Sequence, residues 1–213
     1  MVSEQGVLWC KNEQLRHVKC LWPALTEILN IYVEKLTADL PHYHNERATV
    51  SFLNGAAWKA GLIAIEEYAT SKIKDGVQYT GRCDLYIAEK NGIEIEFEAK
   101  QNWITGVAGA DDAALSNWID IAVEAARQNI STDIKYAVNF IVPEISGNLG
   151  VEQVSETYFL WKRQFLEKLR NNEEVELFYV WEHPEAMKRQ LESRHGKGPC
   201  CWPGLWIAIT RAF

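Results

Sequence analysis

The sequence lacks any uninterrupted stretch of about 18 apolar residues, the length that a membrane-spanning helix needs. The first residues, MVSEQGVLWCKNEQ, also lack the basic and then apolar order of a secretory signal peptide. Paired cysteines are also lacking. The chain has five cysteines, an odd number, and their spacing forms no recognisable set of pairs. This usage is typical of reduced thiols rather than of a disulfide framework. These features predict a cytoplasmic protein with no membrane partner.

Positive charge is also in short supply. The chain has 22 Lys and Arg against 29 Asp and Glu, a net charge of −7. Nonspecific nucleic-acid binders are usually basic, so the balance disfavours that class. The C-terminal residues 151–213 hold nine charges of each sign. A basic surface is therefore expected there, if the protein has one.

The cysteine, histidine and basic motifs of the chain are typical of structural or solvent-exposed segments. Cys200-Cys201 has no second cysteine pair at the spacing of a zinc site, so we interpret it as structural. His42-Tyr43-His44 follows Pro41 and is interpreted as a loop. Lys188-Arg189 and residues 194–198 make a basic, glycine-containing segment that could hold a phosphate backbone, with a solvated loop as the alternative. One helix face could carry the positive charge of Lys162, Arg163 and Arg170, with an ordinary polar face as the expected alternative.

The composition that is present suits one compact domain spanning residues 1–213. Hydrophobic residues make up 47% of the chain, and no internal repeat or obvious linker divides it. Apolar periodicity predicts helices over about 25–36, 54–71, 110–130 and 154–169, and strands over 134–142, 175–181 and 205–210. Asn54 is the expected N-cap of the second helix, and Trp58, Trp118 and Trp161 are expected to pack in the core. This order predicts an α/β fold, a mixed central β-sheet with helices on both faces.

Residues 80–100 form a predicted β-hairpin around Asn91-Gly92, a strong hairpin signal. The return strand alternates strictly. Its apolar row is Ile93, Ile95, Phe97 and Ala99, and its polar row is Glu94, Glu96, Glu98 and Lys100. Because side chains alternate between the faces of a strand, three carboxylates and a lysine share one face.

Two interpretations of this polar row remain open. On an edge strand whose polar face meets water, the glutamates would only solubilise the sheet, whereas unpaired buried acids would cost several kcal/mol. The alternative is a cation site. Asp84 on the partner strand can meet the glutamate row, and Glu66-Glu67 adds two acids from the preceding predicted helix. Converging carboxylates repel unless a cation lies among them, and oxygen ligands select Mg²⁺ or Mn²⁺.

The motif resembles a known family at this point. Asp84, thirteen further residues and then Glu98-Ala99-Lys100 resemble the D-x(n)-(D/E)-x-K signature of the PD-(D/E)xK nuclease superfamily. Cys83 departs from the pattern, because it stands where the family often has proline. The resemblance covers roughly residues 54–142 and extends toward 181. It implies a restriction-endonuclease-like core made of a helix, a three-stranded meander, a second helix and a further strand.

The resemblance also implies roles for individual residues. Asp84 and Glu98 would bind Mg²⁺ or Mn²⁺, with the Ala99 carbonyl as a third ligand and Glu66 completing the site from the helix, Glu67 being the alternative. Lys100 would orient or deprotonate the attacking water and stabilise the phosphate charge. Gln101 follows the lysine, as in some subgroups of the family. Glu96 is expected to assist the metal shell from outside.

These expectations combine into one functional hypothesis. The chain is predicted to be a metal-dependent nuclease that hydrolyses phosphodiester bonds in DNA, acting as a homodimer or with a partner subunit. Residues 54–181 would form the nuclease-like core, 1–50 an N-terminal helical extension and 182–213 a C-terminal extension. Trp103, just past the motif and expected on a loop, could stack on a base. The alternative is a noncatalytic module on the same fold that binds nucleic acid or protein.

Overall fold

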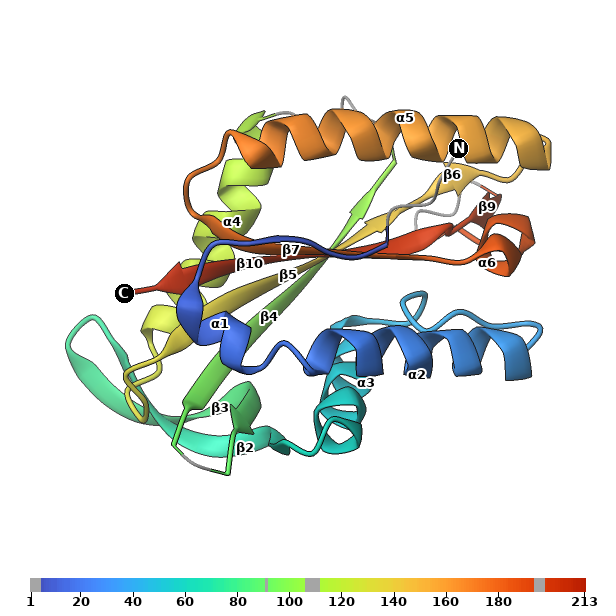
Figure 1. Ribbon diagram of the computed structural model, residues 1–213. Helices are drawn as coiled ribbons and strands as arrows, with labels where there is room; N and C mark the ends of the chain where they lie inside the picture. Colours follow the sequence, from blue (N-terminus) through green and yellow to red (C-terminus); the bar gives the residue numbers. More distant parts are fainter. Residues whose placement is uncertain (1–4, 91, 106–111, 194–197) are drawn as a thin grey trace.

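A computed structural model describes residues 5–90, 92–105, 112–193 and 198–213. Figure 1 shows a central sheet between two layers of helices, which confirms the predicted α/β class with a mixed sheet. Helices α2 (Leu21–Lys35) and α3 (Glu46–Lys59) cover one face, and α4 (Asp112–Arg127) and α5 (Val151–Arg170) cover the other. Two short helices, α1 (Glu13–His17) and α6 (Pro184–Lys188), lie near the sheet.

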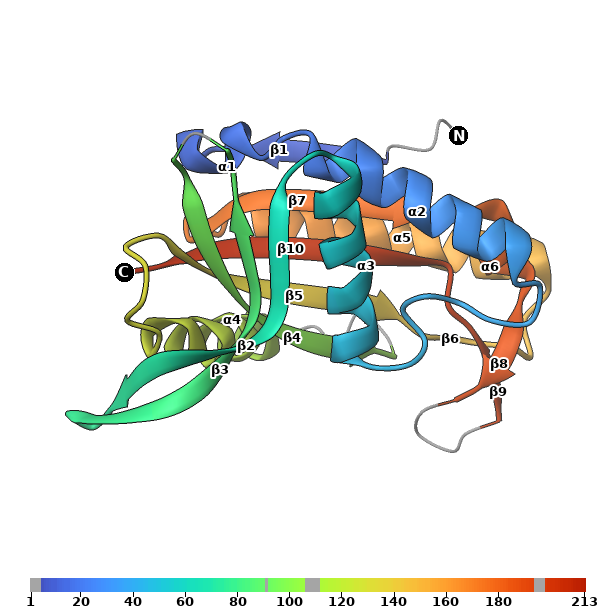
Figure 2. The same cartoon turned by 90° about the horizontal axis from the view of Figure 1, so that it is seen from below.

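The central sheet has seven strands in the order β1-β7-β10-β5-β4-β3-β2. Their bounds are β1 Gly6–Cys10, β2 Ile63–Lys74, β3 Val77–Ala88, β4 Glu94–Ile104, β5 Lys135–Pro143, β7 Val175–Glu182 and β10 Gly204–Ala212. Strands β4 and β5 are parallel, and the other neighbours are antiparallel. A smaller sheet joins β6 (Ile145–Ser146), β9 (Pro199–Cys201) and β8 (Gln190–Glu192). The last long strand, β10, thus lies between β7 and β5 at the centre of the molecule (Figure 2).

Each face of the sheet has its own hydrophobic core. The apolar row of β4, namely Ile95, Phe97 and Ala99, is buried in the core shared with α2 and α3. The opposite core lies beneath α4 and α5 and includes the fully buried Trp206. Trp118 and Trp161 are partly buried against that second core, as predicted. The strict alternation of β4 therefore reflects burial of one row against α2 and α3.

The predicted helix over 54–71 is wrong in its boundaries. Helix α3 starts earlier, where the side chain of Asn45 rather than Asn54 caps it by accepting a hydrogen bond from Ala48 N at 3.0 Å. The helix stops at Lys59, and Gly61, at φ +81°, turns the chain into β2. Trp58 is 57% exposed instead of packed in the core, and its indole donates to the Ala64 carbonyl. The apolar spacing after residue 61 belongs to a strand.

Two basic residues of the C-terminal third, Arg189 and Lys162, have structural partners. Arg189 donates to the backbone carbonyls of Val33, Leu36 and Asp39 at the end of α2. Lys162 is buried and forms an ion pair with Glu182 at 3.1 Å, so the polar face predicted for this part of α5 is wrong at Lys162. Residues 194–197 of the basic segment lie outside the described residues.

Three further expectations can be placed in the structure. Trp103 lies on strand β4 rather than on a loop, and it is partly buried against the α2 and α3 core. All five cysteines lie in the described part of the chain and are free. Among the described residues, no helix is long and apolar enough to cross a membrane.

His42 is fully buried in the loop after Leu40, and this placement leads to a pH prediction. Its Nε2 lies 3.0 Å from the Trp202 carbonyl, and burial lowers the pKa of the imidazole from 6.5 to about 4. A folded-state pKa below the unfolded value gives stability that is present above pH 6.5 and is lost as the pH falls through about 4. This group should remove about 3 kcal/mol of unfolding free energy over that window.

His42→Gln keeps a donor for the Trp202 carbonyl but does not titrate. Urea unfolding of both proteins at several pH values between 7 and 4 would measure the difference. The wild type should lose stability more steeply than the variant. Parallel curves for the two proteins would contradict the prediction.

Candidate functional site

The predicted hairpin is present, and the two strands separate at the motif. Leu85–Ala88 of β3 pairs antiparallel with Glu94–Phe97 of β4. The Glu89 N–H donates to the Ile93 carbonyl at 3.0 Å, so the hairpin closes over three residues rather than two. Asn91 lies outside the described residues, and Gly92 has φ +125°. Before Leu85 in the chain, β3 pairs among the described residues with β2 alone, and the two strands form a long two-stranded ribbon that is visible in Figure 2.

Asp84 lies where β3 leaves β4. Its Oδ2 accepts a hydrogen bond of 2.7 Å from the backbone N–H of Ala99. The β2–β3 pairing continues on both sides of this point but skips Asp84 and Glu67, and Glu67 has φ +54°. The irregularity lets β3 turn away while the Asp84 carboxylate stays against the edge of β4. The separation of the strands therefore places Asp84 beside the Glu98-Ala99-Lys100 segment.

The glutamate row of β4 is largely buried, which overturns its interpretation as a solvated face. Glu94 is exposed, but Glu96 and Glu98 are 0% and 4% exposed. Glu96 accepts hydrogen bonds from the hydroxyls of Tyr68 and Thr132. These contacts satisfy a buried carboxylate, and the role of Glu96 beside a metal stays a prediction.

Glu98 lies deeper in the same polar network. Its Oε1 accepts from Lys72 Nζ at 2.6 Å and from Asn129 Nδ2 at 3.0 Å. Burial and the neighbouring Asp84 charge raise the pKa of Glu98 to about 7, against the lowering effect of Lys72 and Asn129. Asp84 and Glu98 therefore interact electrostatically and repel each other when both are ionised. A divalent cation beside them would remove that repulsion.

Lys100 lies on the same edge and contacts the helix layer. Its Nζ donates to the Ala99 carbonyl at 2.5 Å and lies 3.8 Å from Glu46 Oε1. Burial and the charge of Asp84 raise the pKa of Glu46, while Lys100 and the backbone of Gln101 act to lower it. Glu46, in the first turn of α3, is thus the helix carboxylate beside Lys100, and it interacts electrostatically with Asp84.

Glu46, and not the predicted Glu66 or Glu67, is the acid on the helix beside the motif. Both predicted residues lie on strand β2 and not on a helix. Glu66 accepts from Ser51 Oγ at 3.0 Å, and Glu67 forms ion pairs with Arg47 and Arg82. Glu46 was not among the predicted site residues, because the helix was expected to begin near residue 54 and in fact begins at Glu46. The signal was Asn45-Glu46, an N-cap residue followed by an acid in the first turn.

Gln101 has a packing role in this structure. Its Oε1 accepts from Thr49 Oγ1 at 2.6 Å, and its Nε2 donates to the His42 carbonyl at 3.0 Å. The side chain thereby joins β4 to α3 and to the loop after Leu40. These contacts hold the N-terminal half of α3, which carries Glu46, against the motif.

The donor set fits a hard divalent cation with few protein ligands. Within the described ranges, no three His, Cys, Asp or Glu side chains are grouped to hold a metal ion. Asp84 and Glu98 instead offer two carboxylates, and the Ala99 carbonyl of the same segment accepts a hydrogen bond from Lys100 Nζ at 2.5 Å. Mg²⁺ typically binds one or two carboxylates and takes its remaining oxygens from water and substrate phosphates. Two carboxylates match the protein's share of such a site.

Comparison with known proteins finds no matching family model, no matching curated protein and no matching solved structure. The functional assignment therefore depends on the geometry of this site.

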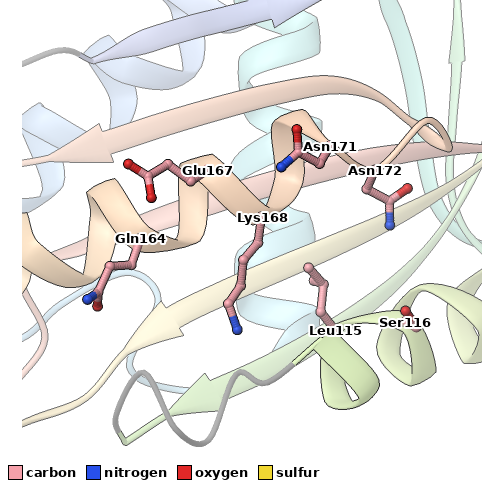
Figure 3. Close-up of a pocket in the computed structure, with 7 residues that line it drawn as sticks. All are labelled: Leu115, Ser116, Gln164, Glu167, Lys168, Asn171 and Asn172. Carbon is pink, nitrogen blue, oxygen red and sulfur yellow. The ribbon is translucent and has the colours of Figure 1, made fainter.

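A separate hollow of about 500 Å³ lies between α4 and the C-terminal end of α5 (Figure 3). It is lined by Leu115, Ser116, Gln164, Glu167, Lys168, Asn171 and Asn172. These residues combine amides with one charge of each sign, and none of them belongs to the predicted motif. The hollow gives no independent indication of a reaction.

Proposed function

We propose that this protein is a metal-dependent nuclease that hydrolyses phosphodiester bonds in DNA. The observation that carries the proposal is the convergence of Asp84 with Glu98-Ala99-Lys100 where β3 leaves β4. The order α3, β2-β3-β4, α4, β5 supports it, because the resemblance to the PD-(D/E)xK nucleases implies that succession. A restriction-endonuclease-like core is part of the same proposal.

Each residue of the site has a stated role. Asp84, Glu98 and the Ala99 carbonyl would hold Mg²⁺ or Mn²⁺, which supplies polarisation of the phosphoryl oxygen and a water of lowered pKa. Lys100 places a positive charge next to that position and stabilises charge on the phosphate. Glu46 holds the Lys100 ammonium from the start of α3. Gln101 fixes the strand that carries these groups.

The net charge of −7 favours a second candidate, a noncatalytic module that binds nucleic acid or protein. An acidic chain repels a phosphate backbone, so a nuclease of this charge would draw DNA contacts from a second copy or from a partner subunit. The joint presence of Asp84, Glu98 and Lys100 favours the enzyme.

Incubation of the purified protein with plasmid DNA, linear duplex DNA and RNA tests the proposal. Mg²⁺ or Mn²⁺ should permit cleavage of DNA, and a chelator should stop it. DNA binding without cleavage under all metal conditions would favour the noncatalytic module. Preferential cleavage of RNA would correct the substrate class.

We expect the cleavage rate to depend on Glu46 more than on Glu66. Glu46→Gln removes the charge 3.8 Å from Lys100 and should lower the cleavage rate about tenfold or more, as outer partners of metal sites do. Glu66→Gln is the matched control, since Glu66 contacts Ser51 on α3. Its rate should stay within about twofold of wild type. A larger loss in Glu66→Gln than in Glu46→Gln would favour Glu66 as the helix-side carboxylate of the site.

A further inference from the structure

We infer that Lys72, assisted by Asn129, is a positioning residue that orients the Glu98 carboxylate toward the metal. Neither residue belongs to the D…ExK motif: Lys72 lies on β2, and Asn129 follows α4. The inference rests on the proposed function, because it assigns Glu98 to a metal site. It adds two residues that the motif resemblance does not name.

The contacts select one oxygen of Glu98. Lys72 Nζ at 2.6 Å and Asn129 Nδ2 at 3.0 Å both donate to Oε1. In the part of the chain that the structure describes, the hydrogen bonds to this carboxylate all reach Oε1, which leaves Oε2 as the oxygen for a cation. Lys72, Glu98 and Asn129 are 8%, 4% and 0% exposed, so solvent does not compete for these contacts. Partners that fix a ligand's orientation commonly tune metal affinity.

Both donors are themselves held in place. A Cβ built on Gly81 would lie 2.7 Å from Lys72 Cδ, so the glycine leaves the space that the lysine stem occupies. Strand β2 is joined to the chain after α4 by an isolated bridge between Lys72 and Asn129. Two backbone bonds flank that bridge, Ile73 N to Gln128 O at 2.8 Å and Ile130 N to Ser71 O at 3.1 Å. The two donors therefore form one rigid unit facing Glu98.

An opposing role for Lys72 predicts the opposite result. If the ammonium served only to neutralise Glu98, it would compete with a cation, and its removal would tighten metal binding. If it positions the carboxylate, its removal should weaken metal binding. The sign of the change in affinity separates the two roles.

The test is Mn²⁺ titration by calorimetry, without substrate, of wild type, Lys72→Met, Lys72→Arg and Asn129→Ala. Lys72→Met and Asn129→Ala should bind Mn²⁺ about 10- to 100-fold more weakly, and Lys72→Arg should recover part of the affinity. Lys162→Met is the matched control, because it also breaks a buried Lys–Glu pair, with Glu182. It should lower the melting temperature without changing Mn²⁺ affinity.

Unchanged or tighter Mn²⁺ binding in both Lys72→Met and Asn129→Ala would overturn the positioning role while leaving the proposed nuclease intact. A wild type that neither binds Mn²⁺ nor cleaves DNA would overturn the proposed function, and the positioning role with it. If circular dichroism shows that Lys72→Met does not fold, Asn129→Ala and Gly81→Ala decide. Gly81→Ala keeps every charge and displaces only the Lys72 stem, so it too should weaken Mn²⁺ binding.

Discussion

Lys100→Ala is expected to lower the rate of DNA cleavage about 100-fold or more while the protein stays folded. The lysine is the positively charged member of the motif, and its loss removes a stabiliser of charge that develops on the phosphate. Its side chain is 35% exposed and its ion pair with Glu46 is long, at 3.8 Å. Such pairs contribute about 1 kcal/mol or less to stability, and no buried cavity is created. DNA affinity should fall less than the rate, because phosphate contacts are spread over many groups.

Glu94→Ala is the control for this experiment. Glu94 lies on the same strand and belongs to the same polar row, but it is exposed and outside the motif. Cleavage rate, DNA affinity and melting temperature of the three proteins are compared at one salt concentration. Equal losses in Lys100→Ala and Glu94→Ala, or no loss in either, would mean that Glu98-Ala99-Lys100 is not the catalytic motif.

Metal should stabilise the folded wild type, and Asp84→Asn should abolish that effect. A cation between Asp84 and Glu98 relieves the repulsion that helps to raise the pKa of Glu98. At a metal concentration of 100 times Kd the gain is about 2.7 kcal/mol in unfolding free energy. The amide introduced by Asp84→Asn would still offer an oxygen to the Ala99 N–H, so the hydrogen bond at 2.7 Å and the fold should survive.

Thermal unfolding with increasing Mg²⁺ or Mn²⁺ measures this stabilisation. NaCl at the same ionic strength controls for screening of the net charge, and Asp39→Asn controls for the loss of one carboxylate away from the motif. Melting temperatures of wild type and Asp84→Asn that rise together with metal would contradict a site at Asp84. If the melting temperature of the wild type does not change with metal, the free protein does not bind the metal, and a site could form only together with substrate phosphates.

Local patterns were sufficient for most of the fold. The alternation from Glu94 to Lys100 predicted which row of β4 is buried against the α2 and α3 core, because a strand with a period of two has only two faces. The apolar periodicity over residues 25–36 and 134–142 was equally informative, because these segments correspond to α2 and β5. These signals lie within a few residues of one another along the chain.

The boundary between α3 and β2 was not predictable in this way. Leu62, Ile65 and Ala69 fit a helical stripe by spacing, and the competing signal was a single glycine, Gly61. An expectation that apolar residues are buried would not have distinguished a helix from a strand here, since Ile65 is 49% exposed on its strand. Because of this wrong boundary, Glu66 was predicted on a helix, and Glu46 was not recognised as a residue of α3.

The sequence by itself determined that Asp84 and Glu98 lie on adjacent strands, and that the apolar row of β4 is buried, because hairpin register and the period of two are local properties. The tertiary structure decided what surrounds the polar row. Lys72 reaches Glu98 from 26 positions earlier in the chain, and Asn129 reaches it from 31 positions later. Glu46 meets Lys100 only because α3 packs beside the point where β3 leaves β4. Whether a carboxylate is solvated, paired or free to bind a metal depends on such distant neighbours, since burial and charge are set by the packed molecule.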